Sequence, residues 1–323
     1  CRGEYQSMAG VEPVQCAVKV RPIELQTLVT ENSIRLECNH ENICGMIGTV
    51  ETATSHYLIL QLCSTSVQDA IDAGKLQAAL GSRTPVSACS GVIEAVGALH
   101  AQGFIHGNVN PSNVLLDDSG TPKLSGFSCS AQLRDDGSCT LFRARCTPGF
   151  SPPEVVVGIA QEDDAVEVSA PLAVDAFGLG CTLFTILSGG NAFDGESTEE
   201  IQDNVTAGNS RVELDASVPL EAQNLIKGLT AADPAARPNA EVARAHPLFW
   251  TPQTKVQYLS NVGATLPVSL KRSQNPFIAG LEAAVDELIG PYDEDEPEKG
   301  GSWARELGGK YPIGGDRGKV QRP

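Results

Sequence analysis

Residues 106–116 read His-Gly-Asn-Val-Asn-Pro-Ser-Asn-Val-Leu-Leu, and this stretch decides the predicted fold. Its polar first half, which contains a proline, is typical of a loop, and its apolar end is typical of a short strand. A second short strand is expected at Lys123-Leu124. Up to residue 63 the pattern is strand-rich with one helix, whereas helical periods dominate afterwards. The sequence therefore predicts an α+β fold with a small β-rich lobe followed by a larger helical lobe.

Each lobe has its own predicted elements. In the first lobe we expect a helix at 24–37 and strands at 14–20, 43–50 and 57–63. In the second lobe we expect a long ordered loop at 128–152 and helices at 67–80, 88–102, 171–188, 219–230 and 239–246. Two further helical candidates, 253–262 and 275–289, follow Trp250.

The composition limits the function classes. The chain has 323 residues, with 23 Lys and Arg against 40 Asp and Glu and a formal net charge of -17. Such a surface repels phosphates, so broad nucleic-acid binding is disfavoured and no DNA partner is expected. No apolar run approaches the roughly 20 residues that span a bilayer. Ten cysteines without C-x-x-C spacing are typical of reduced thiols in a cytosolic protein.

The stretch at 106–116 resembles the catalytic loop of eukaryotic protein kinases, whose pattern is His-Arg-Asp-x-x-x-x-Asn. His106 and the metal-binding Asn113 match this pattern, but the Arg is Gly107, the catalytic Asp is Asn108 and the following Lys is Asn110. In the family that Asp accepts the proton of the substrate hydroxyl, and a neutral amide accepts a proton poorly. The resemblance implies a two-lobed protein kinase fold in which Asn108 is a degenerate catalytic position.

A second kinase motif is degenerate in the same way. Residues 123–128, Lys-Leu-Ser-Gly-Phe-Ser, align with Lys-x-x-Asp-Phe-Gly, so Phe127 matches and the metal-binding Asp is Gly126. Without this carboxylate, magnesium loses its main protein ligand, and the resemblance implies at most weak magnesium dependence. Asp117 or Asp118 could be proposed as a displaced carboxylate, although both have the pattern of turn residues.

The nucleotide-binding positions of the resemblance are better preserved. Ala17-Val18-Lys19 resembles the strand that carries the nucleotide-binding lysine, and Glu31 stands where its helix partner belongs. The resemblance implies that Lys19 contacts the α- and β-phosphates. It also implies an adenine site with these residues in the strand that enters the hinge: Leu60 as the gatekeeper, Gln61 and Cys63.

Scaffold positions of the family are also present. Glu154 closes the activation segment, and the resemblance implies that it pairs with Arg237, since a buried carboxylate needs a bidentate guanidinium. Asp175 matches the residue that caps the backbone of the catalytic loop. With His106 and Phe127, these residues imply a preserved fold.

Arg35 departs from the kinase pattern. Kinases usually place an apolar residue four positions after the helix glutamate, and a buried arginine is costly there. We expect either that the helix turns outward or that the register shifts by one residue, which would bring Ile34 or Leu36 inward.

The end of the resemblance indicates a branch of the family. His246-Pro247-Leu248-Phe249-Trp250, the helix pattern at 255–259 and Leu60-Gln61-Leu62-Cys63-Ser64 resemble the inositol-requiring enzymes, the kinase–endoribonucleases that sense unfolded proteins. The resemblance divides the chain into a kinase-like domain at 1–250 (N-lobe 1–63, C-lobe 64–250), with the Gly-rich loop missing, and the start of a ribonuclease-like extension at 251–290. An acidic and then Gly-rich tail at 291–323 is expected to be disordered. The RNA-cleaving motifs of the family do not occur in the chain.

Three functions remain open. The first is a catalytically impaired kinase-like domain that binds ATP weakly and acts by conformation, through homodimerisation of its lobes or protein partners, with RNA involved only if a complete ribonuclease domain exists in the full gene product. The second is an active serine/threonine kinase. The third is a non-binding scaffold or truncated gene fragment. The sequence favours a soluble cytoplasmic location for this chain, which starts without Met, while the family lies in the endoplasmic reticulum membrane with this domain on the cytosolic side.

Overall fold

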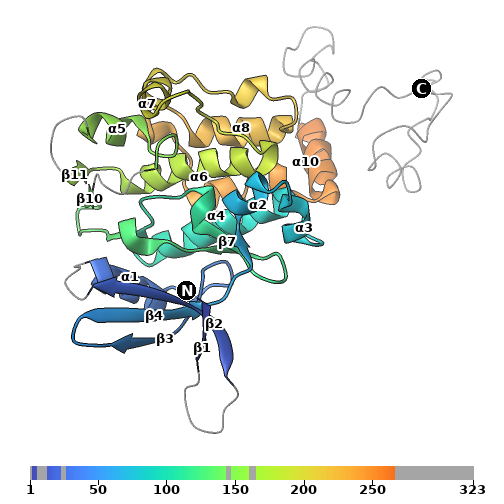
Figure 1. The fold of residues 1–323 in the computed structure, drawn as a ribbon. Coiled ribbons are helices and arrows are strands. Elements are labelled where there is room, and N and C mark those ends of the chain that lie inside the picture. Colours follow the sequence, from blue (N-terminus) through green and yellow to red (C-terminus); the bar gives the residue numbers. More distant parts are fainter. Residues whose placement is uncertain (1, 6–12, 23–26, 143–146, 160–164, 266–323) are drawn as a thin grey trace, which may run out of the picture. The chain divides into compact units, whose positions relative to one another are not determined.

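A computed structural model describes residues 2–5, 13–22, 27–142, 147–159 and 165–265, and the chain divides into two units, Cys1–Phe249 and Trp250–Pro323. In the first unit a β-rich part precedes a helical part (Figure 1). The predicted α+β, two-lobed class is confirmed.

The β-rich part is one antiparallel sheet with the strand order β1-β2-β4-β3. Its strands are β1 (Arg2–Tyr5), β2 (Val14–Pro22), β3 (Met46–Glu51) and β4 (Ser55–Gln61), and its helix is α1 (Thr27–Glu37). Pairing of β2 with β4 sets Ala17 opposite Leu60 and Lys19 opposite Leu58. Because side chains alternate across a strand, Ala17 and Lys19 share one face of the sheet.

The helical part is built around α4 (Pro85–Ala101) and α6 (Pro171–Ser188). The helix α4 begins in a capping box formed by Thr84 and Ser87, with Pro85 in its first turn. The helix α6 ends at Gly189, whose φ of 77° is accessible to glycine at little cost. Phenylalanine side chains at 104, 177 and 184 are fully buried in the core between these helices and their neighbours.

The other helices are α2 (Val67–Asp72), α3 (Leu76–Leu80), α5 (Pro153–Ile159), α7 (Thr198–Ala207), α8 (Leu220–Leu229) and α9 (Ala240–Arg244). The other strands are β5 (Thr65–Ser66), β6 (Phe104–Ile105), β7 (Val114–Leu116), β8 (Pro122–Leu124), β9 (Ala131–Gln132), β10 (Cys139–Phe142) and β11 (Ala165–Val168). The helix α6 is long and apolar enough to cross a membrane by composition, but most of it is buried inside the domain, as in the core helix of a globular protein.

Two local predictions were wrong, and two helices were not predicted. The helix predicted at 67–80 is two helices, because the backbone turns at Gly74 with a φ of 62°. The segment predicted as a loop at 128–152 contains β9 and β10, and the sequence pattern missed α5 and α7.

In the second unit the structure describes α10 (Pro252–Thr265), which includes the helix predicted at 253–262. The Trp250 ring contacts the Tyr258 ring edge to face, with their centroids 5.0 Å apart. The helix predicted at 275–289 and the tail at 291–323 lie outside the described residues.

Candidate functional site

An ion pair joins the sheet to α1. The Lys19 Nζ lies 2.8 Å from Glu31 Oε1 and 3.1 Å from Oε2. The Glu31 side chain is 2% exposed, whereas that of Lys19 is 27% exposed. Burial alone would raise the pKa of Glu31, but the charge and hydrogen bond of Lys19, with those of Arg35, hold it below its usual value. The carboxylate therefore stays ionised and fixes the lysine.

Arg35 points into the domain. Its Nη1 donates to the Cys44 carbonyl at 2.8 Å and its Nη2 donates to Glu31 at 3.1 Å. The guanidinium carbon lies 4.9 Å from the centroid of the Phe127 ring. A carboxylate, a carbonyl and an aromatic face thus compensate the buried charge.

Of the expectations for Arg35 and its neighbours, only the inward position of Ile34 is confirmed. The helix does not turn outward, and the register is unshifted, since Arg35 lies one turn from Glu31 on the same face. Leu36 is 72% exposed, while Ile34 is fully buried beside the arginine in sequence. Glu31 therefore carries two cations instead of one.

The backbone of the catalytic-loop stretch is held by Asp175 of α6. This fully buried carboxylate accepts from the His106 N–H at 2.7 Å and the Gly107 N–H at 2.8 Å, and it pairs with His100 at 2.9 Å. Burial lowers the pKa of His106. A neutral ring fits its contacts, because Nε2 donates to the Ser125 carbonyl and Nδ1 accepts from the backbone N–H of Asn108.

Two asparagines, Asn108 and Asn110, replace charged groups of this loop, and Asn113 is the asparagine that matches the family pattern. The backbone carbonyl of Asn108 accepts from the Asn110 amide at 3.0 Å and from the Asn113 amide at 2.9 Å. The Asn110 amide also donates to Thr147, which ties the loop to the activation segment. The side-chain oxygen of Asn108 is buried and makes no hydrogen bond within the described structure. These neutral side chains bond mainly to the loop's own backbone.

Asn113 fills the space beside Gly126. A Cβ added at Gly126 would lie 2.1 Å from the Asn113 side-chain oxygen, and the φ of Gly126 is 81°. A metal-binding carboxylate at Gly126 would therefore require Asn113 to move. In the parts of the chain that the structure describes, no group of three or more His, Cys, Asp or Glu side chains could hold a metal ion. The residues present thus do not fit a kinase magnesium site.

The Asp117 side chain, considered above as a displaced carboxylate, bonds within its own turn. Its Oδ1 accepts from the Ser119 and Thr121 backbones at 3.0 and 2.9 Å, and its Oδ2 lies 3.6 Å from Lys123. These contacts lower the pKa of Asp117 against the effect of burial. The side chain closes the turn between β7 and β8, as its sequence pattern indicates.

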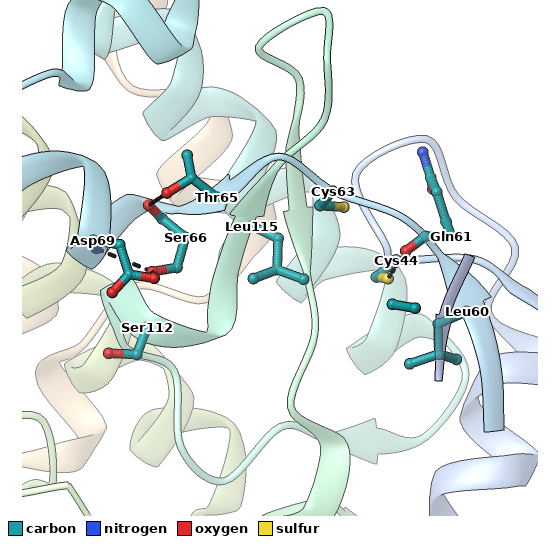
Figure 2. A pocket seen from close by; sticks show the side chains of 10 residues that line it. Cys44, Leu60, Gln61, Cys63, Thr65, Ser66, Asp69, Ser112 and Leu115 are labelled. Carbon is teal, nitrogen blue, oxygen red and sulfur yellow. Dashed lines mark hydrogen bonds between the residues drawn. The ribbon is translucent and has the colours of Figure 1, made fainter. Parts of the chain in front are cut away.

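A cavity of about 360 Å³ opens beside the sheet and receives residues from both lobes (Figure 2). Four of its lining residues are predicted nucleotide-binding positions: Ala17, from the strand of Lys19, and the adenine-site residues Leu60, Gln61 and Cys63. Lys19, Glu31 and Asn113 are not among the residues that line it. The cavity therefore corresponds to the adenine end of the predicted site.

The other lining residues were not predicted from the sequence: Cys44, Thr65, Ser66, Asp69, Ser112 and Leu115. Two signals could have found some of them. Ser66 and Asp69 have the spacing of a helix cap, and the Ser66 side chain accepts from the Asp69 N–H. Leu115 alternates with the buried Val114 and Leu116, so it faces the other way.

The predicted pair at the end of the activation segment is present. Arg237 is a bidentate partner of Glu154, at 2.7 and 2.9 Å, and its guanidinium stacks over Phe177 at 5.2 Å. Its remaining donors reach the carbonyls of Ala173, Ala231 and Ala232. All five guanidinium N–H groups thus have an acceptor.

A Lys–Glu pair between a strand and a helix of the first lobe, and a loop of the second lobe capped by an Asp, are the arrangement of a protein kinase domain. The sequence matches the protein kinase domain family over residues 15–249, and the chain belongs to that family.

Curated relatives include two types of kinase. The chain is 27% identical over 312 residues to the serine/threonine-protein kinase/endoribonuclease IRE1 of Hypocrea jecorina, covering 84% of this chain and 25% of that protein. It is 27% identical over 277 residues to the sensor for unfolded proteins in the ER ire1 of Schizosaccharomyces pombe, covering 78% and 26%. It is 26% identical over 268 residues to the serine/threonine-protein kinase STK11 of Gallus gallus, covering 80% and 56%. The chain spans a quarter to about half of these relatives.

Proposed function

We propose that this chain is a catalytically impaired protein kinase domain that binds an adenine nucleotide without needing magnesium and acts through its conformation. The observation that carries the proposal is that the site keeps its phosphate-binding ion pair but lacks its metal-binding carboxylate. The Lys19–Glu31 ion pair is formed, while the position of the metal-binding carboxylate is a glycine whose space the Asn113 side chain takes. The group that holds phosphate is kept, and the groups that perform transfer are replaced.

The charges of the site support binding without a metal. Lys19 and Arg35 bring two positive charges to Glu31, and neither position 108 nor position 126 adds a carboxylate. The fixed charge at this end is therefore positive, which favours a polyphosphate. In a typical kinase the metal ions neutralise the phosphates. Here part of that role falls to residues of α1 and β2.

We expect ATP to stabilise the protein equally with magnesium and with a chelator. At ATP ten times above its Kd, the expected gain is about 1.4 kcal/mol, which raises the Tm of a domain of this size by about 3–6 °C. Lys19→Met should abolish the shift, whereas the control Lys75→Met, at an exposed site between α2 and α3, should keep it. Thermal melts over an ATP titration measure this. No shift at millimolar ATP would overturn nucleotide binding, and a shift only with magnesium would overturn the metal independence.

We expect no phosphoryl transfer above background. Asn108 supplies no carboxylate to accept the hydroxyl proton, and its side-chain oxygen is enclosed. Transfer of labelled phosphate to a generic protein substrate, or to the chain itself, should therefore equal that of Lys19→Met. Transfer that exceeds this variant would support the active-kinase alternative instead.

The relatives suggest the setting of this domain. Two of them are named as a kinase/endoribonuclease and as a sensor for unfolded proteins in the ER. We extend this to the present chain as a regulatory domain of the same type, on the cytosolic side of the endoplasmic reticulum membrane in its parent protein. Nucleotide occupancy would shift the population of one lobe geometry and so favour a homodimer or a protein partner. Sedimentation with and without ATP tests the dimer.

A further inference from the structure

Two cysteines lie together at the cavity. Cys44 follows the first lobe's helix, and its backbone N–H bonds to the Leu124 carbonyl at 2.8 Å. Cys63 lies just beyond β4, in the connection to β5. Both line the cavity, and Figure 2 shows their sulfur atoms on the same side of it as Gln61 and Leu60. The chain thus brings two thiols from separate segments to one cavity.

The surroundings of the two thiols differ. Arg35, buried and bonded to the Cys44 carbonyl, adds its positive charge beside Cys44, and the hydroxyl of Ser125 also bonds there. The Arg35 Nε is buried without a hydrogen-bond partner among the described residues, so it is a spare donor. Around Cys63 the charged groups are Asp117 and Lys123, of which the carboxylate has the larger effect. An anion is therefore favoured on Cys44 and disfavoured on Cys63.

The coupling between the thiols follows from this asymmetry. The hydrogen bond from Cys63, and then the charge of Arg35, lower the pKa of Cys44 to about 6 despite its burial. The same bond, together with burial, raises the pKa of Cys63. The protonated Cys44 thiol also donates to the Gln61 carbonyl across 3.8 Å, a contact that is lost when Cys44 ionises. By contrast, burial raises the pKa of Cys139 to about 11.

We propose that Cys44 and Cys63 are an oxidisable dithiol of the nucleotide cavity, with Cys44 as the attacking thiolate and Cys63 as the resolving thiol. In the first step Cys44 attacks a hydroperoxide: an S–O bond forms, the O–O bond breaks, sulfur loses two electrons and the peroxide leaves as alkoxide or hydroxide. In the second step Cys63 attacks the sulfenic acid: the S–S bond forms, the S–O bond breaks, and hydroxide leaves with the Cys63 proton as water. A thiol reductant reverses the product.

Oxidation of Cys44 in the first step removes the charge that keeps Cys63 protonated, which favours the second step. Cys63 holds its proton mainly because Cys44 is its hydrogen-bonding partner. A neutral sulfenic acid at Cys44 no longer carries the anion that opposes ionisation of Cys63. The disulfide would place a covalent bridge across one wall of the cavity that Leu60 and Gln61 also line. Oxidation and nucleotide binding then exclude each other, an extension that rests on the proposed function.

The test uses the full chain, treated with hydrogen peroxide and then alkylated and mapped by mass spectrometry. We expect a peptide linking Cys44 to Cys63, which a thiol reductant removes. Cys63→Ser should stop at a sulfenic acid on Cys44 that dimedone traps, Cys44→Ser should give neither product, and the control Cys139→Ser should behave as the unchanged chain. Absence of both the linked peptide and the trapped sulfenic acid would overturn the proposal.

A second measurement does not depend on oxidation or on variants that fold poorly. The pH profile of iodoacetamide modification, followed peptide by peptide in the unchanged chain, should have its midpoint near pH 6 at Cys44. At pH 7 this gives about 30-fold more thiolate than a thiol of ordinary pKa. A midpoint above pH 8 at Cys44 would contradict the proposal. If ATP slows the modification of Cys44, nucleotide binding and thiol chemistry exclude each other as proposed. If the disulfide forms but ATP does not slow the modification, the dithiol proposal stands and the proposed nucleotide binding is contradicted.

Discussion

Replacing Asp175 by alanine is expected to lower the free energy of unfolding by about 3–5 kcal/mol, because several buried donors lose their acceptor at once. The N–H groups of His106 and Gly107 would lose their carboxylate acceptor, and His100 would lose its hydrogen-bond partner. The control Asp203→Ala removes an exposed carboxylate from α7 and should change stability by less than about 0.5 kcal/mol. Urea unfolding measures both. A loss below 1 kcal/mol for Asp175→Ala would contradict the role given to this carboxylate.

The acid limb of the stability curve gives a second readout of the same carboxylate. Burial alone would raise the pKa of Asp175, but the hydrogen bond and charge of His100, with the charge and backbone N–H of His106, hold it below its usual value. Because the folded pKa lies below the unfolded value of about 3.9, the stabilisation is complete above about pH 5 and is lost as the pH falls through the folded pKa. Asp175→Asn should flatten this limb relative to the unchanged chain. An unchanged slope would assign the acid sensitivity to other groups such as Glu31.

The motifs predicted much of the site because each is a local pattern with a fixed partner in the fold. Lys19 on a strand and Glu31 on the following helix meet as the kinase pattern implies, and so do Glu154 and Arg237. Asp175 reaches the loop backbone because α6 is a continuous apolar helix from Pro171 to Ser188, as its sequence predicts.

The remaining features depend on contacts that no local pattern encodes. The burial of Arg35 depends on the Cys44 carbonyl and the Phe127 ring, which come from other segments. The sequence alone predicts Asn113 to be an intact metal ligand. Only the structure shows that the Asn113 side chain takes the space beside Gly126. The two thiols of the cavity lie in different predicted elements, so their proximity is a tertiary result. In each case the contact joins residues from separate segments, so only the folded structure shows which groups meet.

Arg237→Ala is expected to lower the free energy of unfolding by about 3–5 kcal/mol, and this loss should not add to that of Glu154→Ala. The Arg237 side chain is fully buried and bonds to a carboxylate and three backbone carbonyls, so truncation leaves all of these acceptors without their donor. The Glu154 side chain is 28% exposed, so in the Arg237→Ala variant its carboxylate can be hydrated. Its own replacement should therefore cost less than that of Arg237.

A double-mutant cycle separates the pair from the carbonyl contacts. We expect the double variant to be more stable than the sum of the two losses predicts, by about 1–3 kcal/mol, because the pair is counted twice in that sum. Arg237→Lys should recover only part of the stability, since an ammonium cannot match the five-donor fork or stack over Phe177 in the same way. The surface pair of Arg211 and Asp194, with both side chains 52% exposed, is the matched control, and its coupling should stay below about 1 kcal/mol. Equal coupling in the two cycles would show that burial adds nothing to the Arg237–Glu154 pair.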